Sequence, residues 1–156
     1  MNANATLITR FYTAFQQRDA ATMAACYHAD IVFNDPVFVN LRGAEAGAMW
    51  QMLCERGKDL VITFGDVQAD DSTGRAHWEA TYTFSKSGRK VHNIIEARFK
   101  FQDGLIIEHH DSFSFRRWSA QALGLPGQLM GWTPFLHKKV QQESRHTLEK
   151  FMARSS

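Results

Sequence analysis

Four strand-like stretches in the second half of the chain constrain its fold most strongly. Each is rich in β-branched and aromatic residues, and Asp, Ser and Gly fill the gaps between them, a composition that favours hairpins. Successive hairpins predict an antiparallel meander, and the alternation of side chains gives the sheet one buried aromatic face. The stretches are Leu60–Val67, Arg75–Phe84, Lys90–Phe101 and Leu105–Phe115.

Helical patterns flank these strands. Apolar residues from Leu7 to Phe15 recur at spacings of three and four, which is typical of an amphipathic helix. Capping residues and stop signals predict four further helices. These are Ala20–Tyr27 behind Asp19, Ala44–Arg56 before Gly57, a short helix from Ser119 to Leu123, and a long one from Thr133-Pro134 to about Met152, with a turn at Gly124–Gly127. We therefore expect an α+β fold: a cone-shaped barrel of curved antiparallel sheet, N-terminal helices packed on it, and a C-terminal helical extension.

Composition excludes several classes of function. The 156 residues suit one domain, and a formal charge of +2 is too small to indicate a polyanionic partner, so we expect no nucleic acid. No stretch has the length and apolarity of a membrane span, no signal peptide is visible, and we expect no membrane partner. Cys26 and Cys54 lack metal-like spacing, which favours reduced thiols in a cytoplasmic protein, although a disulfide between them stays open. There is no Gly-rich phosphate loop, and we expect no cofactor.

Asp35 is an acidic residue inside a strongly apolar strand, Ile31–Val39. Alternation places it on the same face as Phe33, and a carboxylate among apolar neighbours has a pKa raised toward the range useful for proton transfer. The competing interpretation is an Asp-Pro turn at the end of the strand, a common role for Asp.

His109 and Asp111 share one face of the last predicted strand with Phe113. If that face is the aromatic interior, the imidazole and the carboxylate both point into an apolar cavity, where they could transfer protons. A structural His–Asp hydrogen bond is the alternative. No third ligand stands at a diagnostic spacing, so we expect no metal.

Two further polar residues are candidates for ligand contacts. Asn93 shares a face of its strand with Val91 and Ile95, and Tyr12 on the first helix could present its hydroxyl to the same cavity. Alternation alone does not decide which row of each strand faces inward.

The segment order resembles the nuclear transport factor 2-like superfamily, in particular its SnoaL-like branch, whose members include ketosteroid isomerases, polyketide cyclases and limonene epoxide hydrolases. The resemblance covers roughly residues 4 to 118. It rests on Arg10–Phe15 through Asp19, Tyr27–Asp30, Phe33–Pro36, Phe99–Ile106 and His109–Asp111.

The resemblance implies roles for individual residues. Asp35 matches the general base of the steroid isomerases, and His109 with Asp111 lies near the acidic residue of cyclase-like relatives. The isomerases' two oxyanion donors fall on Phe11 and Ala97 here, so the resemblance implies that both are replaced. Relatives commonly dimerise through the sheet, and we expect a homodimer.

We therefore predict a cofactor-independent enzyme that uses acid–base chemistry on an apolar small molecule in an enclosed pocket; the alternative is a non-catalytic binding module for an apolar metabolite or a protein partner. Residues 1–118 would form the SnoaL-like domain and residues 119–156 its helical extension, with the long helix covering the cavity mouth or joining a dimer interface. The candidate catalytic residues are Asp35, His109 and Asp111, and the candidate ligand contacts are Tyr12, Phe33, Trp50, Asn93 and Phe113.

Overall fold

The computed structural model describes residues 2–155 and begins with two helices, α1 (Ala3–Gln16) and α2 (Ala20–Ala25). The Asn2 side chain caps α1 by accepting hydrogen bonds from two backbone N–H groups, and Asp19 caps α2 in the same way through Thr22. Helix α2 is shorter than predicted. It ends at Ala25, because Tyr27 already begins the first strand.

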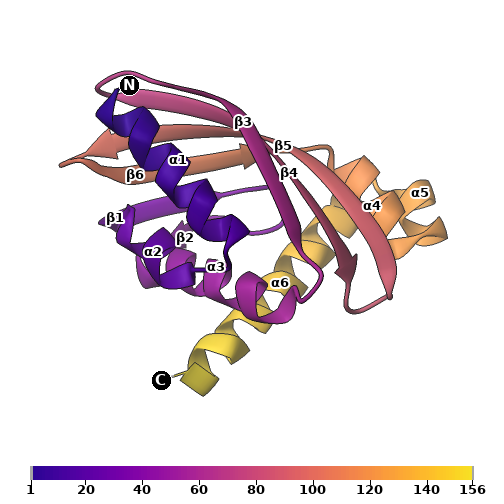
Figure 1. Cartoon of the computed structure of the whole chain (residues 1–156). Helices are drawn as coiled ribbons and strands as arrows, with labels where there is room; N and C mark the ends of the chain where they lie inside the picture. The colour runs from indigo at the N-terminus through magenta and orange to yellow at the C-terminus, as the bar shows by residue number, and fades with distance from the viewer. Residues whose placement is uncertain (1, 156) are drawn as a thin grey trace.

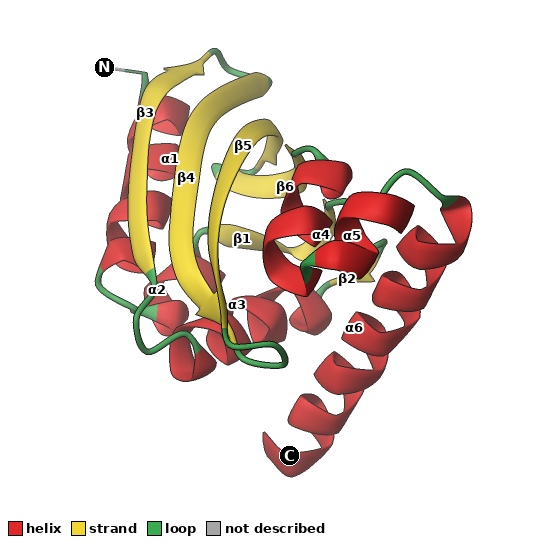
Figure 2. Ribbon diagram, turned by 90° about the vertical axis from the view of Figure 1, so that its right-hand side faces the viewer, coloured by secondary structure: helices red, strands yellow, loops and turns green. Residues whose placement is uncertain are grey.

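The sheet has six strands in the order β2-β1-β6-β5-β4-β3. Strands β3 to β6 form the predicted antiparallel meander, but β1 lies parallel to β6. The sheet is therefore mixed, and it curves strongly without closing on itself (Figures 1 and 2). The strands are β1 (Tyr27–Asn34), β2 (Leu41–Arg42), β3 (Val61–Ala69), β4 (Thr73–Phe84), β5 (Arg89–Gln102) and β6 (Leu105–Ser112).

The register between β4 and β5 decides which side chains face the interior. Along β5, alternate residues from Val91 to Phe99 are buried and those between them are exposed. Tyr82 pairs with Val91 and Ala80 with Asn93, so the same row of β4 turns inward. Sequence alternation had left this choice open.

Helices α1 and α3 (Ala44–Arg56) cover the concave face of the sheet (Figure 1). Their aromatic side chains make edge and stacked ring contacts with residues of β1, β4 and β5. Each fully buried large apolar side chain contributes about 1.5–3 kcal/mol, so this cluster supplies much of the driving force for folding. Its fully buried aromatic members are Phe11, Tyr12, Phe15, Phe33 and Trp50.

Three helices follow β6: α4 (Phe115–Leu123), α5 (Leu125–Met130) and α6 (Pro134–Ser155). The predicted boundaries are wrong at two places here. Strand β6 ends at Ser112 and Ser114, not Ser119, caps the next helix, because its side chain accepts from the N–H of Arg117. The predicted turn at residues 124–127 is the start of α5.

Helix α6 begins as predicted, with Pro134 in its first position and the Thr133 hydroxyl accepting from the N–H of Leu136. It packs along α3, where Arg145 forms a 3.0 Å ion pair with Glu45 (Figure 2). A second apolar cluster joins α4 and α6 to the sheet. Within residues 2–155, no helix combines the length and apolarity needed to cross a bilayer. Cys26 and Cys54 are both buried and free.

Candidate active site

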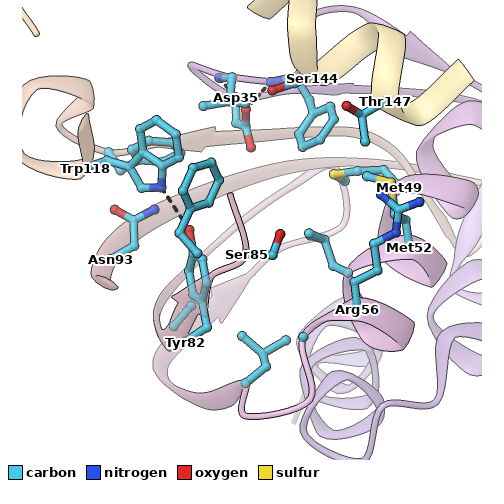
Figure 3. Close-up of a pocket in the computed structure, with 18 of the residues that line it drawn as sticks. Asp35, Met49, Met52, Arg56, Tyr82, Ser85, Asn93, Trp118, Ser144 and Thr147 are labelled. Atoms are coloured by element: carbon cyan, nitrogen blue, oxygen red, sulfur yellow. Dashed lines mark hydrogen bonds between the residues drawn. The ribbon is translucent and has the colours of Figure 1, made fainter. Parts of the chain in front are cut away.

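A pocket of about 380 Å³ lies between the concave face of the sheet and helices α3, α4 and α6. Its lining is mostly apolar, with a few polar side chains that reach it from different elements (Figure 3). The sequence-predicted residues that border it are Asp35, Trp50, Asn93, Asp111 and Phe113. Tyr12, Phe33 and His109 do not: each is completely buried in the core beside the pocket. Their predicted ligand contact or catalytic role stays a prediction.

Asp35 lies just after β1, so the predicted strand Ile31–Val39 is wrong beyond Asn34, where the chain turns. The predicted turn and the predicted rise in pKa are both present. Asp35 Oδ1 accepts hydrogen bonds from the N–H groups of Val37 at 2.7 Å and Phe38 at 2.5 Å, which makes the Asp-Pro turn. The carboxyl group nevertheless points into the pocket (Figure 3). Within residues 2–155, its Oδ2 receives no hydrogen bond and is left for a ligand.

The pKa of Asp35 is raised from 3.8 to about 7. Burial is the main cause, because desolvation penalises the charged form. The nearby Asp111 raises the pKa further, while the two turn N–H groups oppose the shift by stabilising the carboxylate. At neutral pH the group is therefore divided between its acid and base forms.

Asp111 belongs to a chain of buried polar groups behind the pocket. Its Oδ1 accepts from His109 Nε2 at 2.9 Å and from Trp78 Nε1 at 3.3 Å. On the far side of the ring, His109 Nδ1 lies 2.8 Å from the Tyr27 hydroxyl, which accepts from Trp50 Nε1 at 2.8 Å.

The donor and acceptor roles along this series of hydrogen bonds are mutually consistent. The Tyr27 oxygen already accepts from Trp50, so its own proton is free to be donated to His109 Nδ1. The imidazole then carries its proton on Nε2 and donates it to Asp111. Burial raises the pKa of Tyr27 well above its ordinary value, which keeps the hydroxyl protonated as a donor. The His–Asp hydrogen bond left open by the sequence is present.

Tyr82 is a pocket residue that the sequence did not single out. Its hydroxyl accepts from Trp118 Nε1 at 2.8 Å, which leaves the hydroxyl proton free to be donated. Burial raises its pKa, the Trp118 hydrogen bond opposes this, and the nearby Asp35 adds to it. Asn93 lies beside Tyr82 and Trp118, and the group stands across the pocket from Asp35 (Figure 3).

The pocket also has charged side chains at its border. Arg56 lies over the ring of Phe151 at 5.6 Å from its centroid, and Lys86 approaches Glu143 to 3.9 Å. Both members of the Lys86–Glu143 pair are more than half exposed, so they contribute little to stability. Among residues 2–155, no three His, Cys, Asp or Glu side chains are placed to hold a metal ion.

Comparison with known sequences identifies the family. The sequence model of the SnoaL-like domain matches residues 8–109, about two thirds of the chain. The chain belongs to the SnoaL-like family. This places it in the nuclear transport factor 2-like superfamily. No curated protein matches the chain.

Solved structures share the fold at low sequence identity. An M. tuberculosis LEH-like epoxide hydrolase is 18% identical with a TM-score of 0.62, over 81% of this chain and 95% of that one. A hypothetical protein with a ketosteroid isomerase-like fold from Catenulispora acidiphila, in complex with trimethylamine, is 15% identical (TM-score 0.66; 82% and 97%). A putative polyketide cyclase from Xanthomonas campestris is 21% identical (TM-score 0.62; 75% and 95%). These likenesses concern the fold.

Proposed function

We propose that this protein is a cofactor-independent enzyme that carries out acid–base chemistry on an apolar small molecule held in the pocket. One observation carries the proposal: the carboxyl of Asp35 borders an apolar cavity, and its pKa is raised to about 7. A general base works best when its pKa lies near the operating pH. The SnoaL-like fold is also shared by proteins described as a cyclase and an epoxide hydrolase.

Asp35 would act as the base through its Oδ2, by abstracting a proton from a carbon next to a carbonyl or by activating water against a lactone or an epoxide. Its Oδ1 is held by the turn, so the carboxyl cannot rotate away from the pocket. Asp35 keeps the proton after transfer at little cost, because its neutral form is favoured by burial.

Tyr82 and Asn93 would orient the oxygen of the substrate. A hydroxyl and an amide across the pocket from the base are suited to donate to an oxygen on which charge develops. They would replace the oxyanion donors of the steroid isomerases, whose positions hold Phe11 and Ala97. Asp111, held by His109, would supply a second pocket carboxylate and help keep Asp35 protonated after transfer.

The substrate must be found before the reaction can be tested. Mass spectrometry of co-purified small molecules and thermal-shift screening of apolar ketones, lactones and epoxides would find it. We expect Asp35→Asn to lower kcat by about 10²–10⁴-fold, because the amide cannot accept a proton. The matched control is Asp70→Asn: Asp70 makes the same kind of turn with Ser72 and Thr73 on an exposed hairpin, and its loss should leave kcat unchanged.

The pH dependence tests the assignment directly. If Asp35 is the base, kcat/KM rises with pH, with a midpoint near 7, and then reaches a plateau. That limb should be absent from any residual activity of the Asp35→Asn variant. Turnover unaffected by both Asp35→Asn and Asp111→Asn would rule the proposal out.

A binding module for an apolar metabolite is the second candidate. The observation that favours it is that Phe11 and Ala97, where the isomerases have their donors, carry no polar atom in their side chains. Such a protein would show saturable binding of the co-purified compound with no product formed. The homodimer, the cytoplasmic location and the domain boundary at residue 118 stay predictions, and sedimentation analysis would test the first.

A further inference from the structure

The α5 helix has its apolar side chains on the outside. Its only fully buried residue is Gly127, which packs so closely on α4 that an added Cβ would collide with the backbone of Ser119. Leu125 and Leu129 are each 65% exposed, and Met130 is also exposed. A short helix that buries a glycine and exposes its leucines reverses the usual arrangement, and such a surface indicates an interaction.

The apolar surface continues into the start of α6. Trp132 is 67% exposed and Phe135 68% exposed. The indole of Trp132 is fixed beside α5 by a 3.2 Å hydrogen bond from Nε1 to the carbonyl of Leu129. We call this surface the α5 patch: Leu125, Leu129, Met130, Trp132 and Phe135. It lies at the outer corner of the molecule where α5 meets α6, away from α1 and α2 (Figure 2).

The sequence segment that carries the α5 patch has charge of one sign. Residues 112–142 contain four Lys and Arg and no Asp or Glu, a net charge of +4, whereas the whole chain carries +2. The remainder, with 14 basic and 16 acidic residues, is therefore at −2. Lys138 and Lys139 are exposed three and four residues after Phe135 and so share its side of α6, and the exposed Arg116 has its backbone next to Gly131.

We propose that the α5 patch docks the protein on an anionic lipid surface. Exposed Trp, Phe and Leu beside Lys and Arg are the side chains of peripheral membrane-binding segments: the apolar groups enter the headgroup region and the cations meet anionic lipids. A second copy of the chain is disfavoured as the occupant, because a two-fold contact would bring together two segments that each carry a net charge of +4.

Such docking requires no membrane-spanning segment. It would also place the pocket near the bilayer. Leu123 and Val140, which border the pocket, stand on either side of the patch in the sequence. An apolar ligand could then pass between lipid and pocket without crossing water.

The test uses the whole protein and two kinds of vesicle. One is phosphatidylcholine alone, and in the other about one lipid in three is phosphatidylglycerol. We expect co-sedimentation with the anionic vesicles only, decreasing as salt is raised. The Lys138→Gln/Lys139→Gln variant should bind about 30-fold more weakly, since each cation near an anionic surface contributes about 1 kcal/mol. Trp132→Ser/Phe135→Ser should lose about tenfold or more.

Two matched controls keep the test specific. Val61→Ser/Ile94→Ser removes exposed apolar side chains elsewhere, and Lys58→Gln/Lys100→Gln removes two exposed cations elsewhere. Both should bind like the wild type. Because Trp50, Trp78 and Trp118 are buried, shielding of tryptophan emission from acrylamide on vesicle addition would report Trp132.

Three outcomes would overturn the proposal: no binding of the wild type to anionic vesicles, equal loss in the patch variants and the controls, or equal binding to neutral vesicles. Concentration-dependent dimerisation that Trp132→Ser/Phe135→Ser abolishes, without vesicle binding, would assign the patch to a second copy of the chain instead. Thermal melts of each variant would show that the fold is intact.

Discussion

The β6 wall of the pocket and the turn after β1 each contribute a carboxylate, but they hold it differently. On β6, Asp111 is bound by two ring N–H groups, and the chain of contacts continues through His109 to Tyr27. After β1, Asp35 is bound only by backbone N–H groups at one oxygen, and burial raises its pKa. Each carboxylate receives its hydrogen bonds at one oxygen, so the two differ in their donors and in the pKa of Asp35. Asp111 is held by side-chain rings of the core, whereas Asp35 is held by its own turn and can exchange a proton near neutral pH.

The first test of this comparison removes His109, which lies at the centre of the hydrogen bonds behind the β6 wall. His109→Ala should destabilise the fold by about 3–5 kcal/mol, because it opens a cavity among aromatic rings and removes the acceptor of the Tyr27 hydroxyl and one of the two donors to Asp111. Urea unfolding measures this. The control is His110→Ala: the partly exposed His110 side chain pairs with the partly exposed Glu108, and its loss should change stability by less than about 0.5 kcal/mol. Equal effects from the two variants would show that the buried hydrogen bonds of His109 add no stability.

The second test concerns Asp35, whose substitution should stabilise the protein rather than destabilise it. The folded-state pKa of Asp35 is about 7 against 3.8 ordinarily, so the folded state binds more protons between these values and loses stability as pH rises through that window. Asp35→Asn removes the free-energy cost of ionising a buried carboxyl group, and the amide oxygen can still accept the hydrogen bonds of the turn. At pH 8 it should stabilise the protein by up to about 4 kcal/mol, and at pH 4 by much less. A pH-independent difference in urea unfolding would contradict the raised pKa.

The third test, Tyr82→Phe, asks whether the hydroxyl across the pocket from Asp35 takes part in the reaction. Loss of a hydroxyl that donates to the substrate oxygen should lower kcat by about 10–100-fold with little change in KM. The Trp118 N–H loses its acceptor as well, so Trp118→Phe serves as the control: it removes the N–H but keeps the Tyr82 hydroxyl. If both variants lose activity equally, the role of Tyr82 is to hold Trp118 in place.

The smallest expected effect is that of Tyr12→Phe. The Tyr12 hydroxyl is buried and, among residues 2–155, finds no hydrogen-bond partner. Removing an unpaired buried hydroxyl should leave stability unchanged or raise it by up to about 1 kcal/mol, with turnover unchanged. A marked loss of activity in this variant would mean that the hydroxyl reaches the substrate, as the sequence predicted.

Much of this arrangement could be predicted from the sequence, and the failures have physical reasons. The meander, the Asp35 turn and α6 follow from local signals: alternation, Asp-Pro, and Thr-Pro at a helix start. Tyr82 could not be found, because alternation is symmetrical and only pairing with β5 fixes its face. His109 was predicted in the cavity, but a Tyr27 hydroxyl from another strand lies beside its ring. No local signal indicates such long-range contacts.

The parallel pairing of β1 with β6 also bears on how the protein folds. Phe33 lies opposite His109, so the strand that leads to Asp35 obtains this neighbour only after more than seventy further residues have been synthesised. Pairings so distant in sequence are slow to form, because loop closure must precede any gain in contacts. During synthesis, β1 therefore emerges with one edge unpaired and its aromatic side chains uncovered. The interval before β6 arrives is when the chain is most exposed to aggregation or to a chaperone.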